Sequence, residues 1–576
     1  MTGLADSQPV ELLITCVLGG AAAVATIGWL IAKTAAGLGG QHVTISLTDS
    51  IRALIDWHRH LGDPRQVFPP HARGRLPGPA LMYLAATIVV AGVVVGGLVA
   101  FRLVRRLQLT GRRGYATGRE VRRTLSRRAA AHRGPAEATG RGRAVIALGI
   151  DQRTGRRLYG APEDSYLYLG PPRSGKSVHL VIPQTLDARG AALVTETRPD
   201  VVSHTMPLRA KQGPVAAFDP QHLAGDGVPR LRWAPHAGCS DPLIAIARAR
   251  ALAAGAQLSP ATVTDAAFWQ GMTEAVLRCY LHAAALEERS MRDVLTWTTR
   301  PSDPTPMRIL RSHPDAAPGW VEELAAQAAA DPRQRDSVWA GVRRAVDSLA
   351  DPRVLDACSP AAAEALDLKE FIRDRGSLYL LGTTGAQLTV APLVTALVEA
   401  LVDTARTVAA ATPGRRLDPP LTVLLDEAAN IAPIPSLPNL LADGGGSGIT
   451  TICVLQSLAQ ARARWGQAGA DAMWDAATTK VILGGLAHAE DLHRISQLAG
   501  DIDDQVSTRT HGAGGASTSV SSRRLAALPI EMLRTLPEGT AIVLARRTPP
   551  VRARLTPWWD GPHARAIQAG LTVRST

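Results

Sequence analysis

The sequence predicts an α/β protein built on a mostly parallel β-sheet, with an all-α insertion domain and two N-terminal transmembrane helices. Three observations lead to this prediction. Short apolar segments alternate with helical segments from about residue 145, which is typical of parallel sheets. The alternation stops at residues 241–366, which are rich in alanine and in amphipathic helical patterns. Two segments near the N-terminus, Leu12–Ala32 and Ala80–Ala100, contain no charged residue.

Each uncharged segment has 21 residues, and a helix of that length spans ~32 Å, about the thickness of the hydrocarbon core of a bilayer. We therefore predict a membrane anchor at residues 1–101, with transmembrane helices at 12–32 and 80–100. Asp6 and Glu11 stand where a signal peptide would carry basic residues, so we expect no cleaved leader. A buried core helix rich in alanine and glycine is the alternative for either segment.

Arginines are dense after the second segment, so residues 102–144 are predicted to be a basic juxtamembrane linker. The positive-inside rule places everything after residue 101 in the cytoplasm and returns the N-terminus to the same side. We expect a multi-pass protein of the cell membrane whose sheet domain is cytoplasmic. The net charge of +13 favours anionic partners, either nucleic acid or an acidic membrane face. The arginine run is interpreted as a topology and lipid-contact signal, with a DNA-tracking surface as the alternative.

A glycine-rich segment fits the phosphate-binding P-loop pattern. A predicted strand, 165–169, precedes it, and the helix that follows begins at Val178 and is expected to end at Pro183. Backbone N–H groups of such a loop reach phosphate oxygens, and the positive end of the helix points at the same anion. The segment consists of Gly170, Pro171, Pro172, Arg173, Ser174, Gly175, Lys176 and Ser177.

Two side chains of this segment have separate roles. Lys176 places a positive charge beside the β and γ phosphates, and Ser177 offers its hydroxyl to Mg²⁺. We therefore predict ATP and Mg²⁺ as the cofactors of the segment 170–177. A fortuitous turn of glycine and serine is the alternative.

Two carboxylates follow the apolar segment 421–425, a predicted central parallel strand, at the end where open α/β sheets bind ligands. Asp426 is assigned to the metal ion, and Glu427 to orienting or deprotonating the attacking water. A strand that ends in a solvated acidic turn is the alternative. The apolar strand 450–455 ends in Gln456, whose amide is assigned to sensing the γ-phosphate. Capping of the next helix is the alternative for this amide.

The strand pattern defines one nucleotide-binding domain that the insertion interrupts. Its two parts are residues 145–240 and 367–550, the insertion occupies 241–366, and residues 551–576 form a C-terminal tail of unassigned structure. The predicted strands are 165–169, 191–195, 215–218, 377–381, 421–425, 450–455, 480–483 and 541–545.

Three further features bear on this organisation. Ser507–Arg524 is rich in serine, threonine and glycine and is predicted to be a mobile loop. Tryptophans dispersed in the insertion, such as Trp297 and Trp339, are interpreted as core anchors, with stacking on bases as the alternative. The five cysteines have no metal-ligand spacing and are predicted to be inert thiols.

Taken together, these features resemble the coupling proteins of type IV secretion and conjugation, the TraG/TraD-type ATPases. Two N-terminal spans, a basic linker, a P-loop and an all-α insertion follow one another in the same order in that family. The most specific block begins at Leu424 and is similar to the TraM-recognition region of TraD and TraG. The resemblance covers roughly residues 10–550. The matching segments outside the P-loop are 195–200, 218–220, 424–438, 442–449 and 454–460.

The resemblance implies a RecA-like P-loop NTPase core in a membrane-anchored motor that hydrolyses ATP and is a homo-hexamer when active. Members of the family recruit a relaxase bound to single-stranded DNA, or protein substrates, and pass them to a type IV secretion channel. On the matching positions, Lys176 and Ser177 take the nucleotide and metal roles. Asp426 takes the metal role, Glu427 activates water, and Gln456 is the sensor.

One feature departs from related motors, in which an arginine of a neighbouring subunit stabilises charge on the γ-phosphate. The loop Gly444–Gly448 contains no arginine, and Arg462, Arg464 and Arg494 are the nearest candidates. The missing arginine motivates one alternative to DNA coupling, a membrane receptor or scaffold that binds ATP and barely hydrolyses it. A protein-export motor on the same scaffold is a separate alternative.

Overall fold

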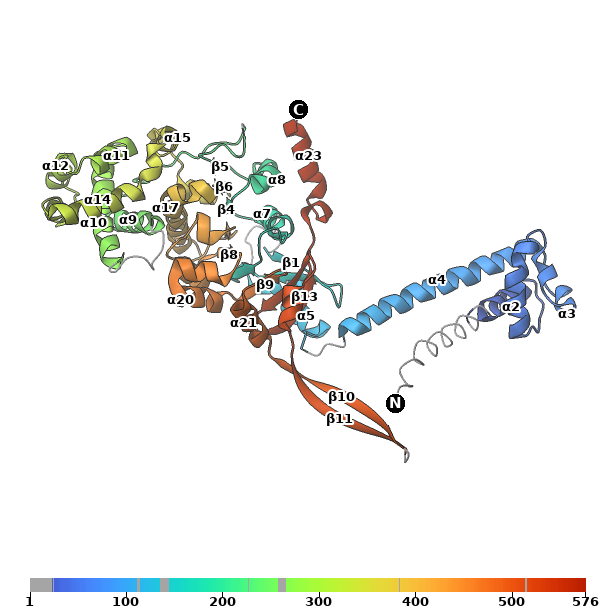
Figure 1. Ribbon diagram of the computed structural model, residues 1–576. Coiled ribbons are helices and arrows are strands. Elements are labelled where there is room, and N and C mark those ends of the chain that lie inside the picture. The colour runs from blue at the N-terminus through green and yellow to red at the C-terminus, as the bar shows by residue number, and fades with distance from the viewer. Residues whose placement is uncertain are drawn as a thin grey trace. The chain divides into compact units, whose positions relative to one another are not determined.

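The computed structural model describes residues 23, 25–110, 114–134, 144–225, 227–256, 266–382, 384–512 and 515–575. The chain divides into two compact units, Met1–Gly111 and Arg112–Thr576 (Figure 1). The first unit is helical, and the second contains the β-sheet.

The first unit contains one helix that is long and apolar enough, among the described residues, to cross a bilayer. It is α4, Pro79–Thr110, whose segment Pro79–Val99 has a mean hydropathy of 2.3 and is mostly exposed. This segment coincides with the predicted transmembrane helix 80–100. The remaining elements of the unit are α2 (Leu47–Asp56), η1 (Trp57–Arg59), η2 (Pro64–Val67) and α3 (Pro70–Arg73).

The other predicted transmembrane helix, 12–32, is not supported. Residues 12–22 and 24 lie outside the described residues, and the rest belongs to an apolar helix whose described part, Ala25–Leu38, is shorter than a membrane span. Its alanines Ala32 and Ala35 are buried in a small core with Phe68 and other apolar residues of the unit. Because these alanines pack against protein, two spans and a multi-pass topology do not follow from the structure.

The second unit is built on one large sheet that is mostly parallel, as predicted. Its order is β2-β1-β13-β12-β9-β3-β8-β7-β4-β6-β5, and the run from β9 to β5 is parallel throughout. The parallel strands are β3 (Tyr166–Leu169), β4 (Ala192–Glu196), β5 (Val215–Phe218), β6 (Ser377–Leu381), β7 (Leu421–Leu425), β8 (Ile449–Leu455) and β9 (Thr479–Leu483).

Antiparallel strands extend the sheet beyond β9. Ala541 of β12 pairs with Leu483 of β9, and β13 and β1 continue the order so that the first and last strands of the unit pair with each other. Sequence analysis predicted β12 and missed the other three. These strands are β1 (Ile146–Asp151), β2 (Arg157–Gly160), β12 (Thr540–Ala545) and β13 (Thr548–Arg554).

Helices cover both faces of the sheet, which explains the continuously apolar strands. Along β3, Leu167 and Leu169 face one hydrophobic core, while Tyr166 and Tyr168 face the other. The helices outside the insertion are α5 (Gly118–Thr124), α6 (Arg127–Arg133), α7 (Ile182–Asp187), α8 (Asp200–Arg209), α17 (Thr384–Ala410), α18 (Ala428–Ile431), α19 (Leu437–Asp443), η6 (Gly444–Ser447), α20 (Leu458–Ala476), α21 (Ala489–Ala499), α22 (Ile530–Arg534), η7 (Trp558–Asp560) and α23 (Ala564–Ser575).

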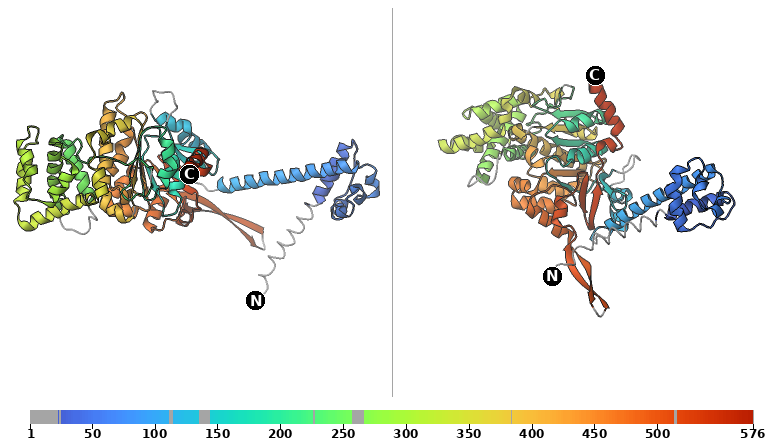
Figure 2. Two further views of the ribbon diagram at one scale, coloured as in Figure 1. Left: turned by 90° about the horizontal axis from the view of Figure 1, so that it is seen from above. Right: turned by 45° about the vertical axis from the view of Figure 1, so that its right-hand side comes forward.

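The residues between β5 and β6 form a cluster of helices next to α17 (Figure 2). Trp297 and Trp339 are buried in the core of this cluster, as the core interpretation of these tryptophans expects. The helices are α9 (Pro242–Gly255), α10 (Ala266–Leu286), α11 (Met291–Thr299), α12 (Thr305–Ser312), α13 (Trp320–Ala328), α14 (Pro332–Ala345), η4 (Asp347–Ala350), α15 (Pro352–Ala357), η5 (Ala362–Glu364) and α16 (Leu368–Arg373).

The predicted mobile loop Ser507–Arg524 is instead part of a β-hairpin. Strand β10, Asp501–Gly512, pairs with β11, Gly515–Ala526, in an antiparallel ladder that runs from Asp501 opposite Ala526 to Gly512 opposite Gly515. The hairpin extends away from the large sheet (Figure 1). The loop prediction was wrong because it relied on polar composition, whereas backbone pairing of two strands does not require apolar side chains.

Candidate nucleotide site

The glycine-rich segment 170–177 joins the C-terminal end of β3 to the helix that follows. Two of its residues have left-handed backbone angles, Arg173 with φ 62° and Gly175 with φ 79°. A Cβ atom at Gly170 would lie 2.7 Å from the Ser174 hydroxyl and 3.1 Å from the Cβ of Leu483, so the loop passes close to its neighbours at this position. The loop therefore has the tight turn that brings consecutive N–H groups toward one point.

The helix after the loop does not end at Pro183, in contrast to the prediction. Its first turn, Ser177–Val181, is a π-turn in which the N–H of Ile182 donates to the carbonyl of Ser177, and α7 continues to Asp187. Proline lacks an N–H and cannot join the usual helical ladder. Pro183 falls in the first turn of α7, where a missing N–H leaves no bond unmade.

Lys176 is buried and turned back onto its own loop. Its Nζ donates to the carbonyl oxygens of Gly170 and Pro171, at 2.7 and 2.8 Å. Burial lowers the pKa of this ammonium group, while the negative charges of Asp426 and Glu427 act in the opposite direction. The positive charge of Lys176 thus lies at the loop, within the field of both carboxylates.

Asp426 follows β7 directly, and β7 is separated from β3 only by β8. The Ser177 hydroxyl donates to Asp426 Oδ2 at 3.4 Å, while the buried Oδ1 has no hydrogen-bond partner among the described residues. Burial raises the pKa of Asp426 to about 6, and the charge of Lys176 opposes this rise. The Thr195 hydroxyl donates to the Asp426 backbone carbonyl at 2.7 Å, which fixes the end of the strand.

Glu427 has a left-handed backbone, with φ 53° and ψ 44°, which is uncommon outside glycine. The Gln456 side-chain amide donates to Glu427 Oε1 at 3.1 Å. The Gln456 backbone N–H donates to the side-chain oxygen of Gln460. The N-cap residue of α20 is Ser457, and its side chain forms no capping hydrogen bond. Gln456 therefore contacts the predicted catalytic carboxylate and does not cap the next helix.

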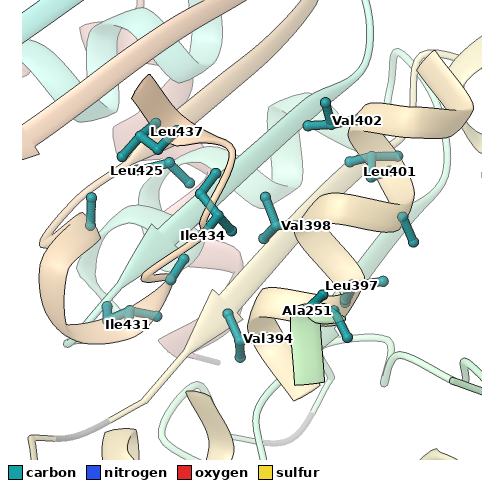
Figure 3. Packing of buried hydrophobic residues seen from close by; sticks show 14 of the residues in the cluster. Ala251, Val394, Leu397, Val398, Leu401, Val402, Leu425, Ile431, Ile434 and Leu437 are labelled. Carbon is teal, nitrogen blue, oxygen red and sulfur yellow. The ribbon is translucent and has the colours of Figure 1, made fainter. Parts of the chain in front are cut away.

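Packing behind this turn holds it in place. Leu425 and Ile434, on either side of Glu427, are fully buried against Val398 and Leu401 of α17 (Figure 3). Glu399 of the same helix accepts hydrogen bonds from the Ser436 N–H and hydroxyl, at 3.1 and 2.8 Å. Helix α17 thus supports the segment that follows the two carboxylates.

Three residues near the site were given no role from the sequence, although Thr195 and Glu196 belong to the matching segment 195–200. The Nδ1–H of His179 donates to the Gly175 carbonyl at 2.9 Å, and Thr195 contacts Asp426 as described. Glu196 accepts hydrogen bonds from the N–H groups of Val201 and Val202, and burial raises its pKa well above the usual value. The polar ending of an apolar strand at 192–196 was the signal that could have identified Thr195 and Glu196.

The loop Gly444–Gly448 contacts the rest of the chain closely at two positions and is open at Gly446, where a Cβ would meet nothing within 4 Å. A Cβ at Gly445 would lie 2.2 Å from the Glu163 carbonyl oxygen, and one at Gly448 would lie 2.5 Å from that of Leu417. Side chains therefore do not fit at these two positions.

Two of the three candidate arginines named above already form ion pairs with aspartates of this chain. Arg462 bonds to the buried Asp491 at 2.9 Å, and Arg494 pairs with Asp471 and lies over the ring of Trp474. For Arg464, burial lowers the pKa of the guanidinium.

The cysteines are buried wherever the structure describes them: Cys239, Cys279, Cys358 and Cys453. Burial raises the pKa of all four thiols, that of Cys239 to about 11. A high pKa keeps a thiol protonated and unreactive, in agreement with the prediction of inert thiols.

Comparison with known proteins confirms the resemblance to the TraG/TraD type. Residues 420–538 match the family model described as the TraM recognition site of TraD and TraG. This range contains Asp426, Glu427 and Gln456. No curated protein sequence matches the chain.

Solved structures share the fold. The unbound bacterial conjugative coupling protein TrwB, without its first 70 residues, has 19% sequence identity and a TM-score of 0.50 over 69% of this chain and 85% of that one. TrwB in complex with the GTP analogue GDPNP has 17% identity and a TM-score of 0.50, over 69% and 86% of the two chains. TrwB with the ATP analogue ADPNP has 18% identity and the same TM-score, over 69% and 85%.

Proposed function

We propose that this TraG/TraD-type chain is a membrane-anchored P-loop ATPase that acts as a coupling protein in conjugation. In this function it recruits a relaxase–DNA complex, with the DNA single-stranded, and drives it into a type IV secretion channel. The family match over residues 420–538 supports the coupling role, and the TrwB complexes with nucleotide analogues support nucleotide binding. By analogy with the family, we also propose a homo-hexamer.

One observation carries the ATPase proposal. Ser177 and Asp426 are about 250 positions apart in the sequence, yet the hydroxyl of one donates to the carboxylate of the other at 3.4 Å. Lys176 and Glu427 adjoin these two residues. Four side chains with the chemistry of phosphate and metal binding thus converge at the C-terminal ends of parallel strands, where α/β sheets bind ligands.

The residues divide the work by their chemistry. The segment 170–177 binds the phosphates through its N–H groups, and Lys176, released from its loop carbonyls, neutralises phosphate charge. Glu427 orients and deprotonates the attacking water. Gln456 holds Glu427 through its amide and exchanges this contact for the γ-phosphate, which makes it the sensor.

Mg²⁺ fits the residues present. Asp426 Oδ1 is a buried acceptor without a partner among the described residues, and Ser177 offers a second oxygen beside it. Oxygen donors of this kind suit Mg²⁺, which takes one or two carboxylates and completes its shell with water and phosphate. The ion would neutralise charge on the β and γ phosphates.

The test is ATP hydrolysis by the full-length protein in detergent, with and without single-stranded DNA. We expect turnover that DNA stimulates, and its loss in Lys176→Ala and in Glu427→Gln. Glu427→Gln retains ATP binding because it lacks only the base, whereas Lys176→Ala loses binding. Undiminished turnover in Glu427→Gln would refute the catalytic assignment.

A protein-export motor is the first alternative, and the salt dependence of DNA binding separates it from a DNA-coupling protein. Phosphate contacts release counterions, so affinity for single-stranded DNA falls roughly 300- to 16,000-fold between 50 and 200 mM salt when about 6–10 phosphates are contacted. A DNA-coupling protein has this steep slope in a titration with single-stranded DNA. Turnover without DNA stimulation and without such a slope favours the export motor.

A receptor or scaffold that binds ATP with little hydrolysis is the second alternative. It is motivated by the glycine loop 444–448, which supplies no arginine, since an arginine finger contributes about 10³–10⁵ in rate. Multiple turnovers of ATP per chain in a steady-state assay would exclude it.

A further inference from the structure

A cavity of about 310 Å³ lies in the second unit beside the helix that follows the P-loop, and the proposed mechanism does not use it. Its floor is strand β1, one wall is the helical segment from His179 to Asp187, and another is the C-terminal segment 556–563. This last segment belongs to the tail that the sequence left unassigned.

Small residues create the space above the floor. Ala147 and Gly149 of β1 line the cavity, whereas Leu148 between them is fully buried in the adjoining hydrophobic core. Gly149 has φ +111°, and a Cβ there would lie 2.8 Å from the Arg554 carbonyl of β13. At these two positions the floor therefore carries no side chain larger than a methyl group, although Ile150 of the same strand also lines the cavity.

His179 connects the cavity to the P-loop. Its ring lines the cavity and also donates a hydrogen bond to the Gly175 carbonyl, at 2.9 Å. Only one residue separates His179 from Ser177. A nucleotide whose phosphates are seated at 170–177 would therefore have its sugar and base at the His179 end of the loop, where the cavity begins.

The C-terminal wall combines an aromatic ring with polar groups. Trp558 lines the cavity and is held by edge-on ring contacts with His204 and Trp559, at centroid distances of 4.7 and 5.6 Å. His563 pairs with Asp187 of α7 at 3.0 Å, which fastens this wall to the P-loop helix.

The shape and lining suit a flat, partly polar ring system. The volume lies at the lower end of the range for small-molecule pockets, roughly 300–1,000 Å³, in which an apolar lining carries a few polar groups. Pro183 and Leu186 add apolar contact, and Arg189 and Asp560 supply charged groups. Aromatic rings stack on any nucleobase, because every base has a π-face.

We propose that this cavity holds the nucleoside part of the nucleotide whose phosphates bind at the P-loop, with Trp558 as a stacking wall and Ala147 and Gly149 as the floor. The inference rests on the proposed function, because it assumes that residues 170–177 bind the phosphates. It makes the C-terminal segment 556–563 a nucleotide-binding element.

The test compares ATP with inorganic tripolyphosphate, which has the phosphates and lacks the nucleoside. Both are titrated with Mg²⁺ against the full-length protein in detergent by calorimetry. Ala147→Phe fills the cavity, and we expect it to weaken ATP binding at least ~10-fold with unchanged binding of tripolyphosphate. Trp558→Ala removes the stacking wall and is expected to weaken ATP binding alone by ~5-fold or more.

Two controls complete the test. Ala566→Phe makes the same substitution on the exposed side of α23, next to the cavity, and should leave both affinities unchanged. Lys176→Ala should abolish binding of both ligands.

Each outcome decides a different question. If Ala147→Phe and Trp558→Ala both bind ATP as tightly as the unaltered chain, the nucleoside assignment is overturned and the phosphate site stands. If Ala147→Phe loses both ligands, it has disturbed the loop, and Trp558→Ala alone decides. If Lys176→Ala binds both ligands normally, the phosphates bind elsewhere, and the proposed function falls together with the inference.

Discussion

At the residue scale, Glu427 combines a left-handed backbone with a position at the proposed site. A left-handed residue other than glycine costs about 1–3 kcal/mol and persists only where its surroundings hold it. Leu425 before it and Ile434 after it are fully buried, and the amide of Gln456 holds its carboxylate. The carboxylate is therefore placed by the fold before any ligand arrives.

This placement predicts the effect of removing the amide. Gln456→Ala is expected to lower the kcat of ATP hydrolysis by roughly 10²-fold, because a misplaced base loses most of a general-base contribution of about 10²–10⁴. Nucleotide affinity should stay within a few-fold, since Gln456 is not in the P-loop. Steady-state hydrolysis and ATP titration measure the two quantities. Gln467→Ala, at an exposed position of α20, is the matched control, and an unchanged kcat in Gln456→Ala would contradict the positioning role.

The residues of the site could be predicted where a local sequence pattern reveals them, whereas their contacts with other parts of the chain could not. The P-loop spacing and the acidic end of an apolar strand are local signals, so Lys176, Ser177 and Asp426 were accessible from the sequence. The contact of His179 with Gly175 was not, because a histidine on a helix has no pattern that reveals its neighbours. The close packing at Gly445 and Gly448 was likewise not accessible from the sequence, because it depends on backbone carbonyls of Glu163 and Leu417 that are distant along the chain or in another loop.

At the scale of elements, the strands that could be predicted from the sequence are mainly those that are buried along their whole length. Central strands such as β7 and β8 are buried along their whole length and read as continuous apolar runs. Strand β1 was missed although residues 145–150 are an apolar run, which is only partly buried near the edge of the sheet. Strand β2 lies at the edge itself and β13 contains two prolines and two arginines, so neither of these two has an apolar run. The hairpin β10–β11 escaped for the same reason.

Helix α17 supports the catalytic turn, and its core contacts predict a stability change. Leu401→Ala should lower the free energy of unfolding by about 2–5 kcal/mol, because it leaves a cavity at a fully buried position. Chemical unfolding followed by tryptophan fluorescence measures the loss. Leu498→Ala, at a position that is 56% exposed, should change stability by less than about 0.5 kcal/mol. Equal effects of the two substitutions would show that α17 is not packed as described.

The ion pair that fastens the C-terminal segment predicts a pH dependence. The hydrogen bond with Asp187 raises the pKa of His563 above its usual value of about 6.5. Because the pKa is raised in the folded state, the ion pair stabilises the folded state fully below pH ~6.5. This stabilisation is lost as the pH rises through the folded-state pKa of His563. Hydrogen exchange in α23, corrected for its intrinsic rate, should therefore increase between pH 6 and pH 8.5. Asp187→Asn should remove this difference, whereas Asp560→Asn should keep it.

At the scale of the whole molecule, α4 is the element that ties the chain to a membrane in the proposed function. Val90→Arg places a charge near the middle of the segment Pro79–Val99, at a cost of about 2.5–3.5 kcal/mol for a helix that crosses a bilayer. We expect a larger fraction of the protein to be released from membranes by alkaline extraction. Val90→Leu is the matched control and should be retained. Full retention of Val90→Arg would show that this helix does not span the bilayer.

The position of β3 in the sheet has a consequence for how the protein is made. Both neighbours of this strand, β8 and β9, begin about 280 residues or more after it. At a synthesis rate of about 5–20 residues per second, a ribosome needs roughly 15–55 s to deliver the first of them. Throughout that interval the nascent chain carries an unpaired apolar strand, the kind of segment that aggregates. We therefore expect the yield of soluble protein to fall when chaperones that bind nascent chains are depleted.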